Sequence, residues 1–277
     1  MNEREVMVLP QRERGLQVGK AFLETRGYQL FVDMCEFCRE AGVVGLCEGA
    51  VGVGKTEAAR RYSQWDLVEP QFSRHGAGQN CVSSGVVMPR VGLYRVGATS
   101  TPKRMEQDLA LLRWELQRLC EKADSGIEEE VSESGYIRPG EVELLIIDEA
   151  NRLCRQGLEV LRDVFEEARV SLVLLGYAGL KQKVLAQPAL ASRVGVHYAF
   201  EGLCEQEVRQ LLQEYIRGRG VEVKEEVASV LVEKTQGNIQ AVLLVLKQIE
   251  YLLRINKLTV LSKRVVEVAS SQLLRRG

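Results

Sequence analysis

The sequence has no run of apolar residues long enough to cross a bilayer. The run from Ala241 to Leu246 is far shorter than the roughly 20 residues that a membrane-spanning helix needs. The first residues, MNEREVMVLPQRERG, mix charges of both signs and lack the apolar core of a signal peptide. We therefore expect a protein with no membrane partner that acts in the cytoplasm.

The sequence also lacks the residue pattern of a zinc site. Its seven cysteines include one close pair, Cys35 and Cys38, but no second pair at metal-ligand spacing and no histidine nearby. We predict that the cysteines are buried or free thiols, which suits a reducing compartment.

An excess of charge of one sign is lacking as well. A net charge of −1 at pH 7 gives no global attraction to nucleic acid, so a DNA contact would need a local basic surface. Hydrophobic residues make up 45% of the chain and charged residues 27%, as in an ordinary globular protein. A length of 277 residues suits one large α/β domain with a small helical appendage.

Helix and strand patterns alternate up to Phe200, which favours parallel pairing through right-handed crossovers. We predict a doubly wound parallel sheet with helices on both faces. A glycine- and serine-rich loop is predicted over 73–89 and a solvated acidic connection over 121–143. The predicted helices cover 17–41, 55–64 and 101–120, and the predicted strands cover 43–47, 91–96, 144–147, 171–175 and 196–200.

The pattern changes after Gly202. Helical periodicity without intervening strands predicts a small helical bundle. Its helices are expected over 205–216, 224–235, 238–253 and 262–274. The expected organisation is a helical lead-in over 1–41, an α/β core over 42–202 and a helical lid over 203–277.

The segment GAVGVGKT follows the first predicted strand and satisfies the pattern G-x-x-x-x-G-K-[ST] completely. Its glycines let backbone N–H groups converge on phosphate oxygens, which side chains would obstruct. Lys55 would neutralise the β- and γ-phosphates, and Thr56 would place its hydroxyl on magnesium. The predicted nucleotide-binding residues here are Gly49, Ala50, Val51, Gly52, Val53, Gly54, Lys55, Thr56 and Glu57.

A second motif, LLIIDEA, ends a predicted central strand in two carboxylates. Asp148 stands where it can hold magnesium through water, and Glu149 can orient or polarise the attacking water. An acidic pair at this place can also merely cap the next helix. Because it accompanies the phosphate loop, we predict a site for ATP and Mg²⁺. Lys55 and Glu149 are the predicted catalytic residues there, and Thr56 and Asp148 the predicted metal ligands.

With these motifs the chain resembles the AAA+ ATPases. Within them it is similar to the initiator-like branch that includes ExeA-type proteins and the transposition regulators MuB, TnsC and TniB. The resemblance spans roughly residues 20 to 255 and rests on GAVGVGKT, LLIIDEA, LASRVGVHYAFEGLCEQEVRQLLQEYI and TQGNIQAVLLVLKQI. It implies a P-loop NTPase core with a helical lid, and a homo-oligomer in the form of a ring or a helical filament.

The resemblance also implies roles for single residues. Arg193 stands where such proteins carry an arginine that enters the neighbouring subunit's active site, although a solvated arginine at a strand's start is the alternative. The sensor-1 place reads Tyr177 instead of a small polar residue, and the sensor-2 arginine place is occupied by Gln240. An uncharged Gln240 can hydrogen-bond phosphate but cannot neutralise it, so we expect slow hydrolysis.

The transposition regulators resemble the chain best in size and domain plan. They imply ATP-dependent assembly on duplex target DNA, with a transposase and target-selection proteins as partners. Two alternatives stay open: a signalling or secretion-assembly NTPase that acts on protein partners, and a helicase-loader-like ATPase that binds single strands.

Candidate DNA contacts lie where the second predicted strand meets its helix, although an ordinary solvated helix start has the same composition. They are Thr99, Ser100, Thr101, Lys103 and Arg104, with Arg152 and Arg155 on the same predicted surface. A second possible basic tract covers 247–277, which holds seven Lys or Arg against Glu250 and Glu267.

Overall fold

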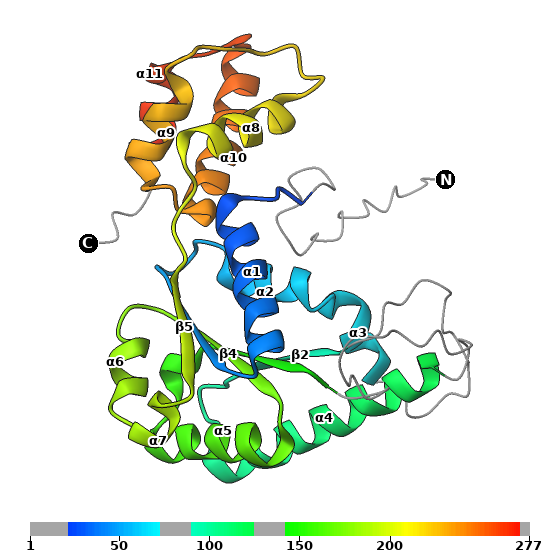
Figure 1. Ribbon diagram of the computed structural model, residues 1–277. Coiled ribbons are helices and arrows are strands. Elements are labelled where there is room, and N and C mark those ends of the chain that lie inside the picture. The colour runs from blue at the N-terminus through cyan, green and yellow to red at the C-terminus, as the bar shows by residue number, and fades with distance from the viewer. Residues whose placement is uncertain (1–21, 73–89, 125–141, 272–277) are drawn as a thin grey trace, which may run out of the picture.

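A computed structural model of the 277-residue chain describes residues 22–72, 90–124 and 142–271 (Figure 1). Several predictions from the sequence fall outside these described residues. They concern residues 1–21 of the lead-in, the loop 73–89, residues 125–141 of the acidic connection, and residues 272–277 at the end of the last predicted helix and basic tract.

Five strands form one parallel sheet in the order β2-β3-β4-β1-β5, which confirms the predicted doubly wound core. The two central strands, β3 and β4, are buried over their whole length, because helices cover both faces of a parallel sheet. The strands are β1 (Val44–Glu48), β2 (Val91–Arg95), β3 (Leu144–Asp148), β4 (Ser171–Gly176) and β5 (Val194–Ala199).

The helices of the core lie on the two faces of this sheet, with α1, α2 and α3 on one side and α4 and α5 on the other (Figure 1). The sequence patterns did not predict α3 or α5 to α7; α3 and α6 are short, and α3 has Pro70 inside it. The core helices are α1 (Arg26–Ala41), α2 (Lys55–Tyr62), α3 (Trp65–Phe72), α4 (Pro102–Asp124), α5 (Arg155–Ala168), α6 (Leu180–Leu185) and α7 (Pro188–Ala191), with a 3₁₀ turn over Ala150–Arg152.

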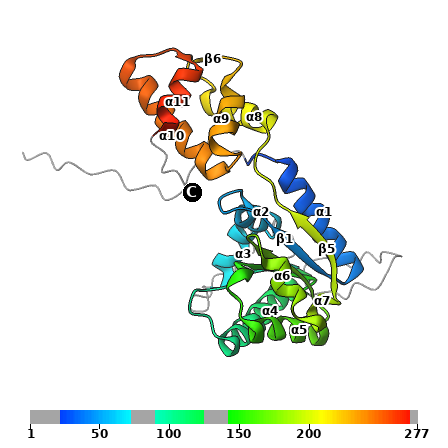
Figure 2. The same cartoon turned by 90° about the vertical axis from the view of Figure 1, so that its left-hand side faces the viewer.

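Four further helices form the lid, a bundle with its own apolar core (Figure 2). They are α8 (Glu205–Ile216), α9 (Val227–Thr235), α10 (Ile239–Asn256) and α11 (Lys263–Ser271). The expectation that no strand interrupts this bundle is wrong, because β6 (Glu222–Val223) pairs in parallel with β7 (Val260–Leu261). Strands of two residues are too short to show an alternating pattern in the sequence.

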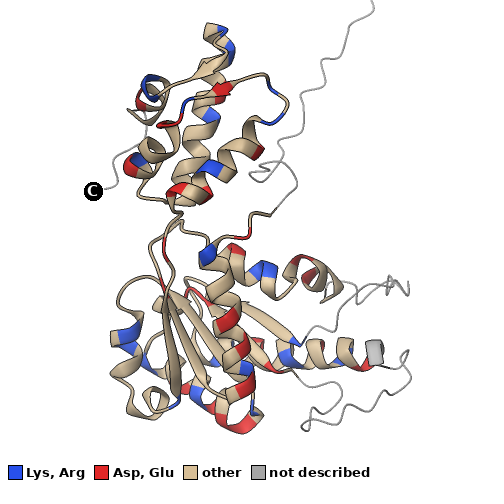
Figure 3. Ribbon diagram, turned by 45° about the horizontal axis from the view of Figure 1, so that its top comes forward, with Lys and Arg blue, Asp and Glu red and all other residues tan. Residues whose placement is uncertain are grey.

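The charges of the described residues are interspersed. Figure 3 shows basic and acidic residues side by side on both the core and the lid, in line with the small net charge. Among the helices in the described ranges, none has both the length and the apolarity needed to span a bilayer.

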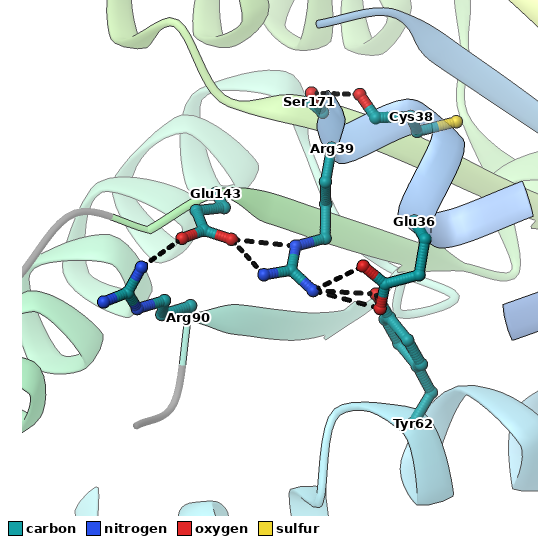
Figure 4. Close-up of polar contacts among 7 residues, drawn as sticks. All are labelled: Glu36, Cys38, Arg39, Tyr62, Arg90, Glu143 and Ser171. Atoms are coloured by element: carbon teal, nitrogen blue, oxygen red, sulfur yellow. Dashed lines mark hydrogen bonds and ion pairs between the residues drawn. The ribbon is translucent and has the colours of Figure 1, made fainter. Parts of the chain in front are cut away.

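A network of charged side chains ties α1 and α2 to the amino edge of the sheet (Figure 4). Glu143, just before β3, accepts hydrogen bonds from Arg39 Nε at 2.8 Å and from Arg90 Nη1 at 2.6 Å. Glu36 accepts from the same Arg39 and from the Tyr62 hydroxyl at 2.7 Å. Burial alone would lower the pKa of Arg39, but its bonds to Tyr62 and Glu143 raise the pKa overall.

The cysteines of α1 and β1 are part of the apolar core. Cys35, Cys38 and Cys47 are fully buried. Burial raises the pKa of both Cys38 and Cys47 to about 12, which keeps these thiols protonated and unreactive at neutral pH. Their role here is packing between α1 and the sheet.

Candidate functional site

The glycine-rich loop joins β1 to α2 at the carboxyl edge of the sheet. Gly52 and Gly54 have left-handed backbone conformations, with φ of +85° and +110°, that side chains disfavour. Gly54 is the N-cap of α2 and no side chain caps this helix end, so its first N–H groups are available to an anion. Of the other predicted loop residues, Ala50, Val51 and Glu57 are exposed, and Val53 is buried.

Lys55 lies inside this loop. Its ammonium donates hydrogen bonds to the carbonyls of Gly49 at 2.7 Å and Ala50 at 2.8 Å. Burial lowers the pKa of Lys55, although Asp148 and Glu149 partly offset that effect. The positive charge is therefore held where the phosphate tail of a nucleotide would lie.

Thr56 and Asp148 meet across the site. The Thr56 hydroxyl donates to Asp148 Oδ2 at 2.9 Å, and the backbone N–H of Glu149 donates to the other oxygen, Oδ1, at 2.9 Å. Asp148 is 4% exposed at the end of β3. Two hard oxygen groups from different elements lie within hydrogen-bond distance beside a phosphate loop, so the residues fit a magnesium ion.

Glu149 faces two arginines instead of open solvent. Arg95 Nη2 lies 3.4 Å from Glu149 Oε1, and Arg152 Nε lies 3.4 Å from Oε2. Arg95 Nε is also 3.8 Å from Asp148 Oδ2. No motif identified Arg95 as a site residue. Arg95 ends β2, and the parallel register of β2 and β3 pairs it with Asp148. Its place at the end of a neighbouring strand is the signal that could have identified it.

An asparagine stands beside the sensor-1 place. Asn151 accepts from the backbone N–H of Tyr177 at 2.6 Å and donates to the Tyr177 carbonyl at 3.0 Å, while the Tyr177 side chain is exposed. Asn151, in the turn that follows β3, therefore fixes the backbone at the end of β4. The sequence analysis missed Asn151 because the two residues are far apart along the chain.

Glu48, the last residue of β1, fixes the start of the phosphate loop. Its Oε1 accepts from the backbone N–H groups of Gly179 and Lys181 at 3.0 Å each, and its Oε2 lies 2.8 Å from His197 Nε2. Burial would raise the pKa of Glu48, but these hydrogen bonds lower the pKa overall. This carboxylate thus joins β1 to β5 and to the start of α6.

The lid touches the phosphate loop directly. The Asn238 side chain donates to the Val51 carbonyl at 2.6 Å and accepts from the N–H of Ala241, so it also caps α10. The N–H of Gln240 donates to the Gly52 carbonyl at 3.2 Å. The structure therefore places Gln240 at the loop through its backbone N–H, and adds Asn238, whose place before a helix is a recognisable N-cap signal.

A cavity of about 770 Å³ opens beside Thr56 and Asp148 and extends between α3 and α4, away from the lid. Its walls are apolar, with charged groups at intervals. They include Trp65, Phe72, Leu93, Leu112 and Trp114, with Arg60, Arg95 and Asp108.

Arg193 lies at the other edge of the sheet. It precedes β5 at the amino end, and its Nη2 is 3.2 Å from Glu166 Oε1. The parallel register pairs Val194 with Val44, whereas the phosphate loop begins after Glu48. At about 3.3 Å per residue, Arg193 is roughly 16 Å from the loop of its own chain.

The candidate DNA contacts are only partly brought together. Thr99 and Lys103 are exposed, and Arg152 donates from Nη1 to the carbonyl of Val96, where the loop toward Thr99 begins. Thr101 caps α4 by accepting from the N–H of Arg104. The Arg104 side chain pairs with Asp108 at 2.9 Å, so two of the candidates are occupied by contacts within the helix.

Two known proteins are similar to this chain in sequence. A "Potential ATP-binding protein" of Staphylococcus aureus is 27% identical over 91% of this chain and 96% of its own length. A "Mu-like prophage FluMu DNA transposition protein B" of Haemophilus influenzae is 29% identical over 161 residues, 56% of this chain; the match spans only 45% of that protein.

Solved structures share the fold. The Thermotoga maritima RuvB Holliday junction branch migration motor matches with a TM-score of 0.54 and 15% identity, over 90% of this chain and 70% of that one. The Aeropyrum pernix ORC2 protein in its ADP form gives a TM-score of 0.54 and 16% identity, over 92% of this chain and 71% of that one. At such low identity, the likeness establishes the fold alone.

A protein-family model described as "AAA domain" matches residues 39–184, which hold the phosphate loop, Asp148 and Glu149. This match covers more than half of the chain, and it agrees with the sheet order and with the two motifs at its carboxyl edge. The chain therefore belongs to the AAA domain family and is an ATPase.

Proposed function

We propose that this ATPase is a DNA-binding regulator of transposition. It assembles on duplex target DNA when ATP is bound, recruits a transposase together with target-selection proteins, and leaves the DNA after hydrolysis. The transposition role is supported by the 29% identity to the Mu-like transposition protein B. The match spans only 45% of that relative, so the relative's whole activity bears on this chain only as part of the proposal.

The observation that carries the link between DNA and ATP is the position of Arg152. Its guanidinium lies between the Glu149 carboxylate, at 3.4 Å, and the Val96 carbonyl, also at 3.4 Å. Val96 begins the exposed loop that holds Thr99 and leads to Lys103. A DNA phosphate that pairs with Arg152 would release one oxygen of Glu149, while the other stays beside Arg95, so DNA binding would change the rate of hydrolysis.

In the proposed site, the N–H groups of the loop and of the first turn of α2 hold the phosphates of ATP. Lys55 neutralises the phosphate tail, and Thr56 and Asp148 would hold Mg²⁺, which would supply further positive charge at the phosphates. Glu149 accepts a hydrogen bond from the attacking water and polarises it. Gln240 supplies no positive charge, so hydrolysis is slow and the ATP-bound state is long-lived.

Arg193 completes the proposed site of a neighbouring copy. Its own phosphate loop is out of reach at the opposite edge of the sheet, and among the described residues its exposed side chain pairs with Glu166 on the surface. An arginine supplied by a neighbour accelerates phosphoryl transfer by roughly 10³ to 10⁵ in related ATPases and GTPases. Hydrolysis therefore depends on assembly into a ring or a filament.

Electron microscopy with duplex DNA tests the proposal. With a nonhydrolysable ATP analogue the protein should coat DNA, and with ADP it should not. Retention on duplex DNA should fall as salt rises, because phosphate contacts release counterions. Separate particles in every condition would refute DNA assembly, and binding of protein partners alone would favour a signalling or secretion-assembly ATPase. Preference for single strands in a competition assay would favour a helicase-loader-like ATPase.

A further inference from the structure

Two helices each carry exposed apolar side chains in a line on their surface. On α1, Leu30 and Phe37 are 38% and 47% exposed. On α10, Leu244, Tyr251 and Ile255 are 46%, 55% and 56% exposed. Residues four and seven apart lie on the same face of a helix, so the members of each set lie along one face of their helix.

Charged residues of opposite sign continue these two faces. Asp33 and Glu40 each follow an apolar position of α1 by three residues, and Lys247 and Arg254 do the same on α10. The spacing of apolar and charged positions is therefore identical on both helices. The α1 stripe comprises Leu30, Asp33, Phe37 and Glu40, and the α10 stripe comprises Leu244, Lys247, Tyr251, Arg254 and Ile255.

Within the described ranges the charged side chains of the stripes form no ion pair in their own chain, although Arg254 also acts electrostatically on Glu250. In the ranges that the structure describes, Asp33, Glu40 and Lys247 form no ion pair. Arg254 lies over the ring of Tyr251 at 5.9 Å, a contact inside its own stripe. In the view of Figure 2, α1 lies on the right and α10 on the left, so the two stripes do not cover each other within one molecule.

We propose that the α1 stripe of one copy docks on the α10 stripe of another copy. The apolar side chains of each stripe find apolar side chains at the same spacing on the other, and each carboxylate meets a lysine or an arginine. DNA is the poorer occupant, since its backbone offers no apolar surface to Leu244 or Tyr251 and the acidic α1 stripe repels phosphate. The charged residues of both helices are coloured in Figure 3.

The two stripes are different surfaces, so the contact is heterologous and repeats from one copy to the next in a ring or filament. It also involves the nucleotide site. Helix α10 begins beside the phosphate loop, where Gln240 contacts Gly52, and α1 packs against β5, the strand that starts after Arg193. Docking therefore joins the edge of one copy that carries Arg193 to the lid of the next. This inference rests on the homo-oligomer of the proposed function.

Charge reversal on each side, followed by mixing, tests the contact. One variant carries Asp33→Lys and Glu40→Lys, and the second carries Lys247→Glu and Arg254→Glu. Each variant alone brings like charges together, so its association constant, measured by sedimentation with Mg²⁺ and a nonhydrolysable ATP analogue, should fall at least tenfold. Mixing the two restores opposite charges at every contact, and the assembly should return. A control with Glu106→Lys and Glu225→Lys changes exposed acids outside both stripes and should assemble like the wild type.

Failure of rescue on mixing would overturn the pairing of the stripes, as would equal assembly of each variant alone. Loss of DNA retention by the Lys247 and Arg254 variant with unchanged sedimentation would instead assign the α10 stripe to DNA and also overturn the proposal. Calorimetric titration with ATP on the same samples separates this inference from the proposed function. A wild type that coats duplex DNA, with both charge-reversed variants assembling equally well at unchanged ATP affinity, would refute this contact and leave the proposed function standing. A wild type that binds ATP but stays monomeric would refute both.

Discussion

At the amino edge of the sheet, Glu143 accepts hydrogen bonds from two arginines at 2.6 and 2.8 Å, whereas at the carboxyl edge Glu149 faces two arginines at 3.4 Å each. The arginines at Glu143 are about one-quarter exposed, while Arg95 at Glu149 is 63% exposed. The first arrangement is a closed network that stabilises the fold. The second consists of weaker pairs that a ligand can replace, which is what a site for a charged substrate requires.

The largest expected effect concerns Arg193, the exposed arginine of the amino edge that we assign to a neighbour's active site. Arg193→Ala should leave ATP binding unchanged and lower the turnover of the assembled protein by roughly 10³ or more, about 4 kcal/mol. The turnover is measured as phosphate release at a protein concentration that permits assembly. Arg162→Ala, which removes a half-buried arginine of α5 that also pairs with carboxylates, is the control. Unchanged turnover in Arg193→Ala would leave Arg193 as a surface ion pair.

Lys55→Ala removes the positive charge that the carboxyl edge holds inside the phosphate loop. We expect turnover to fall by about 10² to 10³, with weaker ATP binding in calorimetry, because no other group replaces the charge. Lys224→Ala, a surface lysine of the lid paired with Glu222, should bind ATP normally. Equal affinity in both variants would contradict the assignment of the phosphate site.

Glu143→Gln removes the carboxylate that Arg39 and Arg90 share at the amino edge, while Arg39 keeps its bond to Glu36. The free energy of unfolding should fall by about 2 kcal/mol, measured by urea denaturation, while ATP affinity stays the same. Glu69→Gln weakens an exposed pair with Arg60 and should change stability by less than about 1 kcal/mol. Similar losses in the two variants would mean that the amino-edge network is no stronger than a surface pair.

Arg95→Ala releases one oxygen of Glu149 at the carboxyl edge. An exposed pair contributes up to about 1 kcal/mol, so basal hydrolysis should rise by no more than about fivefold. Arg152→Ala should act in the same direction and should also reduce the response to DNA. A fall in rate after Arg95→Ala would show that this arginine assists substrate binding instead of restraining Glu149.

Glu48 gives the smallest expected effect, which appears as a pH dependence. Its folded pKa is lowered from the ordinary value of 4.5, so its stabilisation is present above that value and is lost as the pH falls through the folded pKa. Between about pH 6 and pH 3.5 the free energy of unfolding of Glu48→Gln should therefore fall less than that of the wild type. The two falls should differ by under about 1 kcal/mol. An exposed control, Glu57→Gln, should follow the wild type; identical curves for all three would remove Glu48 from this role.

The elements that the sequence predicted are those with a local signal. Four buried apolar residues before Asp148 indicate a central strand wherever they occur, and the spacing of Gly49, Gly54 and Lys55 requires a phosphate loop without any knowledge of distant contacts. Helix α3 and the two-residue strands of the lid were missed because a proline inside a helix and a very short strand leave no periodic pattern.

The contacts around the site needed the tertiary structure. Asn238 reaches Val51 across 187 positions of the sequence, and Asn151 meets Tyr177 across 26. Asn238 lies in the segment TQGNIQAVLLVLKQI and before a helix, but no local pattern shows which backbone group on another element either asparagine reaches. The same holds for Arg95, which the parallel register of β2 and β3 brings to Asp148 and Glu149.

The sequence by itself determined the fold class, the phosphate loop and the acidic pair, since hydrophobic periodicity and glycine spacing act over a few residues. Only the tertiary structure decided which residues hold Glu149, how the lid touches the loop, and that Arg193 lies at the far edge from its own site. Those features depend on which strands are neighbours and on which helix end meets which loop, and such long-range packing leaves no mark in the local order of residues.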